Sequence, residues 1–115
     1  MRKMDTLKKN YEFKQVLTRG KFYKGNMITL YIYKNKEQKN KIGITISKKL
    51  AKATKRNRLK RLIRESYRLQ SQDLKKGYSI IFIWNKNVDI LNCSCQEVMK
   101  DLKKVFERAN LLIYL

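Results

Sequence analysis

The chain has 115 residues, including 29 Lys or Arg, 9 Asp or Glu and no His, so its formal net charge is +20. Such an excess of positive charge repels itself unless a polyanion neutralises it, and it favours a nucleic-acid partner. Hydrophobic residues make up 43% of the chain, which excludes a disordered basic tail. The charge and the length together predict a single nucleic-acid-binding domain over residues 1–115, with one modest core.

The sequence contains no charged-then-apolar leader, and its longest apolar run, residues 80–84, is too short to cross a bilayer. We therefore expect a cytoplasmic protein without a membrane partner. Cys93 and Cys95 are separated by one residue, which is awkward for a disulfide. The pair supplies half of a closed zinc site with no His to complete it, so two reduced thiols are favoured over metal binding.

The first predicted element is a short helix over residues 10–19. Phe13, Val16 and Leu17 fall near helical spacing. Asn10 stands where an N-cap is expected, and Gly20 is placed to end the helix.

Two strands are predicted next, over residues 27–34 and 41–47, with a polar connection between them that indicates a hairpin with a long loop. Side chains alternate between the two faces of a strand. One face is aliphatic, with Ile28, Leu30, Ile32, Ile42, Ile44 and Ile46. The other face is aromatic and hydroxylic, with Thr29, Tyr31, Tyr33, Gly43, Thr45 and Ser47.

A second helix is predicted over residues 55–69, with Thr54 as its cap and an apolar stripe formed by Leu59, Leu62, Ile63, Ser66 and Leu69. Residues 78–84 are β-branched and aromatic, which predicts a buried strand in the middle of the sheet. A last helix begins after Asn92 or Ser94 and carries apolar residues as far as Ile113. These elements predict an α+β sandwich whose helices cover the aliphatic face of the sheet.

The segment from residue 48 to 72 is the most strongly charged part of the chain. It holds 10 Lys or Arg residues and a single acid, Glu65. Its charge cannot be paired within the segment, so the second helix presents cations that need an external polyanion.

Residues suited to catalysis are missing from the sequence. Hydrolysis by the protein itself requires His, paired carboxylates or a metal cluster, and the chain has no His and only scattered acids. Glu97 and Asp101 share a helical face among lysines, which favours a solvated ion-pair face over a metal site. We expect no catalytic residue, no metal site and no cofactor bound by the protein alone.

Two motifs resemble the signature of the bacterial ribonuclease P protein subunit. They are ISKK at residues 46–49 and KRNRLKRLIRE at residues 55–65, and LKKNYEF at residues 7–13 resembles the opening of that family. The resemblance covers nearly the whole chain. It implies a single-domain αβββαβα sandwich with a four-stranded sheet and a left-handed βαβ crossover around the second helix, where general rules predict a right-handed one.

The resemblance also implies a division of labour. In that family the RNA subunit uses Mg²⁺ to remove the 5′ leader of precursor tRNA, while the protein helps to bind the substrate and metal ions. The matching positions imply a surface that binds the RNA subunit, and Arg68 is added to it because it lies off the apolar stripe. The members of this surface are Lys48, Lys49, Lys52, Arg56, Asn57, Arg58, Lys60, Arg61, Arg64 and Arg68. Guanidinium groups pair with phosphates and stack on bases. Arg56 and Arg58 lie on different sides of the helix, and either could instead anchor it.

The family binds the single-stranded leader in a cleft between the first helix and the open face of the sheet. The matching positions are Phe13, Tyr31, Tyr33, Thr45 and Ser47. Aromatic side chains let bases stack without strict sequence readout. For Phe13, core packing is an equal alternative. The chain departs from the family pattern at Leu17, where an aromatic residue is expected, and at residues 25–27, where Gly-Asn-Met replaces Ala-Asn-Arg.

Proteins of other classes would share part of this pattern. A ribosomal or other structural RNA-binding protein would share the charge and the mixture of helices and strands. A double-stranded DNA binder would need a helix-turn-helix, whereas the second helix is flanked by strands, so no DNA partner is expected. A protein-only nuclease or metal enzyme is disfavoured, because this chain lacks the ligands that a catalytic metal would need. The expected partners are the catalytic RNA subunit and precursor tRNA.

Overall fold

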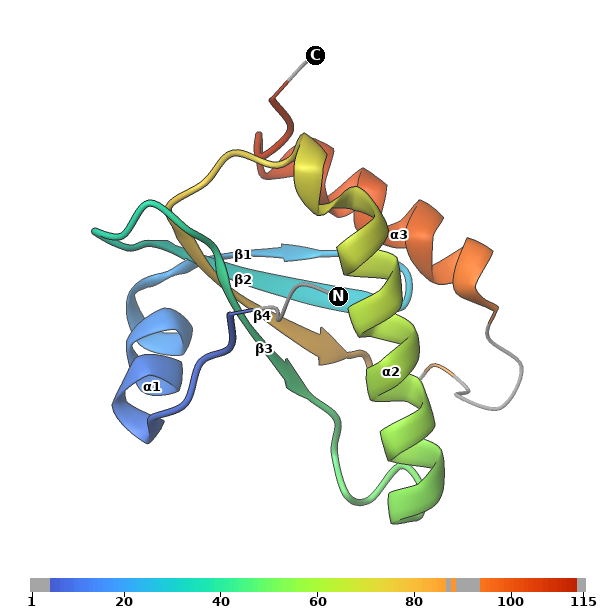
Figure 1. Cartoon of the computed structure of the whole chain (residues 1–115). Helices are drawn as coiled ribbons and strands as arrows, with labels where there is room; N and C mark the ends of the chain where they lie inside the picture. The colour runs from blue at the N-terminus through green and yellow to red at the C-terminus, as the bar shows by residue number, and fades with distance from the viewer. Residues whose placement is uncertain (1–4, 87, 89–93, 114–115) are drawn as a thin grey trace.

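The computed structural model describes residues 5–86, 88 and 94–113, and Figure 1 shows their arrangement. The elements are α1 (Asn10–Arg19), β1 (Lys21–Lys24), β2 (Ile28–Lys34), β3 (Lys41–Thr45), α2 (Ala53–Gln70), the 3₁₀ turn η1 (Ser71–Asp73), β4 (Tyr78–Trp84) and α3 (Cys95–Arg108). This order confirms the αβββαβα prediction. None of the described helices combines the length and apolar composition needed to cross a membrane.

The four strands form one mixed sheet in the order β1-β2-β4-β3. As predicted, β4 lies inside the sheet; it is antiparallel to β2 and parallel to β3. The predicted hairpin between residues 27–34 and 41–47 is wrong, because β4 separates those two strands. β2 instead forms its hairpin with β1, a strand of four residues. The buried side chains of β4 favour a strand on each side.

Helices cover the two faces of the sheet unequally. α2 and α3 pack on the aliphatic face and form the main core with Leu30, Ile80 and Phe82, as predicted. α1 lies on the opposite face, where Leu7, Val16 and Ile81 form a smaller cluster (Figure 1). α2 connects the parallel strands β3 and β4, and the left-handed crossover at this connection stays a prediction.

The observed ends of α1 and α2 differ slightly from the predicted ones. Lys9, not Asn10, is the N-cap of α1, whereas Gly20 is its C-cap as predicted. α2 begins two residues before the predicted start, after Lys52 rather than Thr54. Leu69 is 49% exposed instead of joining the apolar stripe.

Tyr67 and Gln70 are buried where Leu69 was expected. Gln70 lies at the α2–α3 contact and donates a hydrogen bond from Nε2 to the Met99 carbonyl at 3.2 Å. The stripe of α2 is therefore completed by a tyrosine and an amide, because the α3 backbone offers the amide an acceptor.

α3 starts as predicted and ends earlier. Ser94 is the N-cap, and its hydroxyl accepts the Glu97 N–H at 3.2 Å; Asn92, the alternative, lies outside the described residues. The helix stops at Arg108, and Asn110 then takes a left-handed φ of 56°. The reversed chain buries Leu111 and Leu112 against the core beyond the helix, whereas Ile113 is 60% exposed. The prediction of a helix reaching Ile113 is wrong for this reason.

Candidate nucleic-acid interface

The ten predicted RNA-subunit-binding residues lie on α2 and on the loop that leads into it from β3. Eight of them are exposed, and Arg56 and Lys60 are half-buried. We call this set the basic surface; its members are Lys48, Lys49, Lys52, Arg56, Asn57, Arg58, Lys60, Arg61, Arg64 and Arg68. Arg58, Arg61, Arg64 and Arg68 recur at intervals of three or four residues, which brings them to one side of α2 away from its buried stripe.

Only one member of the basic surface forms an ion pair with an acid in the described part of the chain. Arg68 binds Glu65 through two hydrogen bonds, of 3.0 Å from Nε and 2.6 Å from Nη2. This contact lowers the pKa of Glu65 and raises that of Arg68. The other ion pairs of the described residues join Lys39 to Asp5 and Lys41 to Glu12 and Glu37, away from α2. The remaining cations of the basic surface thus keep their charge available to a polyanion.

Arg56 has a structural contact of its own. Its Nη1 donates to the carbonyls of Lys48 at 3.3 Å and Ala51 at 3.1 Å, so its guanidinium fastens the β3–α2 loop to the first turn of α2. Arg58 is exposed. Of the two arginines, Arg56 therefore has the anchoring role, and it holds Lys48 and Lys49 next to α2.

The second predicted site lies on the sheet face that α1 partly covers, which we call the α1-side face. Tyr31 and Tyr33 are half-buried and pack, with Phe13, around Leu7, Val16 and Ile81. Thr45 is exposed, and Ser47 is half-buried with its Oγ accepting the Lys49 N–H at 3.3 Å. The structure therefore brings Phe13, Tyr31 and Tyr33 together, and it gives Ser47 a role in the turn after β3.

Phe13 packs directly on the backbone of β3. A Cβ added at Gly43 would lie 2.5 Å from Cε1 and 2.8 Å from Cζ of Phe13, which is closer than van der Waals contact permits. The core-packing alternative for Phe13 is thus correct. Contact of its half-buried ring with a ligand stays a prediction.

The expected solvated face of Glu97 and Asp101 is wrong for Asp101. This carboxylate is 5% exposed and accepts the backbone N–H groups of Asn26, Met27 and Ile28 at 2.8–3.0 Å. It closes the turn between β1 and β2, where a Cβ at Gly25 would lie 2.8 Å from its Oδ2. The chain requires a glycine here because α3 presses on the turn. No local pattern in the sequence indicates this contact, because Asp101 lies 73–75 residues from the three donors.

Metal ligands do not gather in the part of the chain that the structure describes. No group of three or more His, Cys, Asp or Glu side chains occurs there. Cys95 is a free, half-buried thiol whose Sγ lies 3.5 Å from Ser66 Oγ, and Cys93 lies outside the described residues. Mg²⁺ bound with an RNA subunit stays a prediction.

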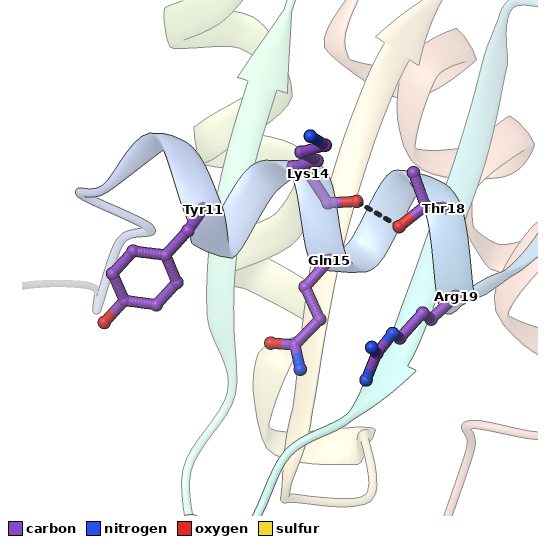
Figure 2. A pocket seen from close by; sticks show the side chains of 5 residues that line it. All are labelled: Tyr11, Lys14, Gln15, Thr18 and Arg19. Carbon is purple, nitrogen blue, oxygen red and sulfur yellow. Dashed lines mark hydrogen bonds between the residues drawn. The ribbon is translucent and has the colours of Figure 1, made fainter.

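Two surface hollows lie outside both predicted sites. One, of about 370 Å³, is lined by Tyr11, Lys14, Gln15, Thr18 and Arg19 of α1. In Figure 2, Tyr11, Gln15 and Arg19 project on the same side of α1, and the Thr18 hydroxyl donates to the Lys14 carbonyl at 2.7 Å. The other, of about 430 Å³, lies between the end of α2 and α3 and includes Leu69, Met99 and Leu112. Neither has the enclosure of a small-molecule site.

A small α+β domain whose longest helix carries unpaired cations has the features of an RNA-binding protein. The family model described as Ribonuclease P matches residues 1–110. The chain belongs to the ribonuclease P protein component family.

Relatives and solved structures agree with this assignment. The Ribonuclease P protein component of Clostridium kluyveri is 40% identical over 107 residues, which cover 91% of this chain and 94% of the relative. That of Clostridium botulinum is 48% identical over 82 residues, covering 70% and 74%. The ribonuclease P protein of Staphylococcus aureus has a similar structure, with a TM-score of 0.84, 26% identity and coverage of 96% and 99%. For that of Thermotoga maritima the TM-score is 0.83 at 26% identity, with coverage of 90% and 96%.

Family membership favours the ribonuclease P interpretation over a ribosomal or other structural RNA-binding protein. It makes the chain a component of a ribonucleoprotein endoribonuclease that processes tRNA.

Proposed function

We propose that this chain binds the catalytic RNA of ribonuclease P through its basic surface. The observation that carries the proposal is that Arg58, Arg61 and Arg64 are exposed on α2 and form no ion pair with a described acid. Guanidinium groups at helical spacing can contact successive phosphates or stack on bases, and Asn57 can bond a base edge or a 2′-hydroxyl. Within this surface, Arg56 holds the loop that carries Lys48 and Lys49.

In this proposal the RNA cleaves precursor tRNA, with Mg²⁺, and the protein contributes binding. The support is chemical: the chain has no His, and its Asp101 carboxylate is occupied by three backbone N–H groups. General acid–base or nucleophilic catalysis by the protein would require such groups to be free and placed together.

The α1-side face is the proposed binding site for the single-stranded 5′ leader. Tyr31 and Tyr33 are half-buried there, and Thr45 is exposed with a hydroxyl that can bond a base or phosphate. Aromatic rings on a sheet suit a leader of variable sequence, because every base has a face that can stack.

Reconstitution tests the assignment. The chain is mixed with bacterial ribonuclease P RNA, and cleavage of precursor tRNA is measured at low Mg²⁺. We expect faster cleavage than with the RNA alone, because the protein adds contacts and screens phosphate charge. An unchanged rate, or cleavage by the protein without the RNA, contradicts the proposal.

Leader binding is tested separately by replacing Tyr31 and Tyr33 with Ala. The complex should then bind leader-bearing tRNA more weakly, by about 1–3 kcal/mol for each stacked base lost, and mature tRNA as before. Tyr11→Ala is the matched control, since Tyr11 is 64% exposed and belongs to α1. Equal losses for both tRNAs would count against a leader site.

A further inference from the structure

Phe22 is a large apolar side chain that the fold leaves exposed beside the proposed leader site. It lies on β1 and is 63% exposed. Its ring centroid is 5.7 Å from that of Tyr31, with 31° between the ring planes. No local pattern of residues predicts β1, and the pairing of Phe22 with Tyr31 depends on the register of the hairpin.

Phe22 ends a row of residues that crosses the whole sheet. The registers pair Phe22 with Tyr31, Tyr31 with Ile81 and Ile81 with Gly43. The row is buried at its β3 end and exposed at its β1 end. Gly43 lies under Phe13 and Ile81 is fully buried, whereas Tyr31 is half-buried and Phe22 is mostly exposed. The accessible aromatic surface of this row is therefore at the β1 edge.

The neighbourhood of Phe22 carries cations. Lys24 follows it by two residues on β1, so both side chains emerge on the same face of the sheet, and Lys24 is exposed. The Arg108 Nη1 donates to the Lys24 carbonyl at 2.7 Å, which ties this end of β1 to α3. An aromatic pair followed by a lysine suits one base and the phosphate beside it.

We infer that Phe22, together with Tyr31, stacks a base of the single-stranded 5′ leader, and that Lys24 contacts a neighbouring phosphate. The leader would then leave the α1-side face across the β1 edge. This inference rests on the proposed function and adds a specific residue and exit direction to it. The competing explanation is a cross-strand aromatic pair that only stabilises the β1–β2 hairpin.

The test uses the complex of the chain with bacterial ribonuclease P RNA. Precursor tRNAs carry 2-aminopurine at successive leader positions, and binding is compared with that of mature tRNA. Phe22→Leu keeps apolar bulk and removes the ring. We expect it to weaken binding of leader-bearing tRNA by about fivefold or more relative to mature tRNA, and to abolish the stacking signal at one or two positions.

Tyr11→Leu is the matched control, because Tyr11 is an equally exposed aromatic residue, at 64%, outside the α1-side face. It should leave the ratio of the two affinities unchanged. If Tyr31→Leu weakens binding of leader-bearing tRNA relative to mature tRNA and Phe22→Leu does not, the inference about Phe22 is wrong, and the proposed leader site is still supported. If neither substitution does so, the leader site itself is wrong.

Phe22→Trp keeps the test decisive if the leucine variant does not fold. This variant retains a stacking ring, so it should bind leader-bearing tRNA at least as tightly as the natural chain. The emission of its new indole should change with leader-bearing tRNA and stay constant with mature tRNA. The same emission with both ligands would overturn the inference.

Discussion

Individual charged residues in this chain have two different roles that their type does not reveal. Asp101 is buried and completes a backbone turn, and Arg56 donates to two loop carbonyls. Arg58 and Arg61, which have similar sequence neighbours, are exposed. A charge that is hydrogen-bonded to the backbone stabilises the fold, whereas an exposed and unpaired cation is available to a ligand.

Asp101→Asn tests the structural role. The amide keeps one acceptor and turns an N–H₂ group toward buried donors, so we expect the free energy of unfolding to fall by about 1–3 kcal/mol. Urea denaturation measures this change. Glu107→Gln is the control on the same helix, because Glu107 is exposed and lies far from the first turn of α3, and it should change stability by less than about 0.5 kcal/mol. Similar losses for both variants would mean that the buried contacts of Asp101 contribute little.

At the scale of elements, α2 separates its tasks by face. Its buried side, with Leu59, Ile63 and Tyr67, packs into the core, and its outer side carries the arginines. The core therefore fixes the direction in which the arginines point. A rigid element positions a binding site more accurately than a loop does.

Replacing both Arg58 and Arg61 with Ala should weaken binding to the RNA subunit and leave folding intact. Binding releases about one counterion for each phosphate contact. Losing two contacts should therefore flatten the slope of log affinity against log salt by about two in total. Affinities measured across a salt series give this slope. Lys100→Ala with Lys104→Ala on α3 removes the same charge elsewhere and serves as control. A slope unchanged from that of the unsubstituted chain would remove the two arginines from the interface.

α1 is held to the sheet by a carboxylate at its first turn. Glu12 Oε1 accepts the backbone N–H of Lys9 at 3.2 Å, and Oε2 lies 3.4 Å from the Lys41 ammonium on β3. Partial burial opposes ionisation of Glu12, but the backbone hydrogen bonds and Lys41 outweigh it and lower its pKa below 4.5. Hydrogen bonding to Glu37, with further attraction from Glu12, raises the pKa of Lys41. The same residue therefore caps α1 and connects it to β3.

Glu12→Gln should lower stability by about 0.5–1 kcal/mol at neutral pH. A carboxyl whose pKa is lowered by folding stabilises above its unfolded pKa, and this contribution is lost as pH falls through the folded pKa. The difference between the two chains should thus be constant above about pH 5.5, shrink below pH 4.5 and disappear in stronger acid. Urea denaturation at a series of pH values measures it. Glu107→Gln, an exposed acid of α3, controls for the loss of one charge. A difference that persists in strong acid would contradict this account.

At the scale of the whole molecule, a net charge of +20 is confined to a domain with a radius of gyration of 13.3 Å. The Debye length is about 30 Å at 0.01 M salt and about 8 Å at 0.15 M. At low salt the charges therefore repel one another across the entire fold, and at physiological salt mainly within neighbouring groups. Because unfolding separates the charges, this repulsion lowers the stability of the compact state.

Raising NaCl from 0.01 M to 0.15 M should raise the Tm of the free chain, by about 4 °C for each kcal/mol of repulsion that is screened. The same change should weaken RNA binding, so stability and affinity should move in opposite directions. Thermal unfolding and binding assays in the same buffers measure both. A Tm that falls or stays constant would mean that self-repulsion does not limit stability.

Local periodicity in the sequence predicted the α+β class, the inner position of β4 and the cationic side of α2, because burial on one side of a helix or strand is recorded at fixed intervals along the chain. The family resemblance predicted the αβββαβα order and most residues of the two proposed sites. Tertiary structure alone decided that β4 separates β2 from β3, that Asp101 is buried against the β1–β2 turn and that Phe22 lies on Tyr31. These features join residues distant in sequence or depend on strand register, and a local pattern shows which side of an element is buried without showing what lies opposite.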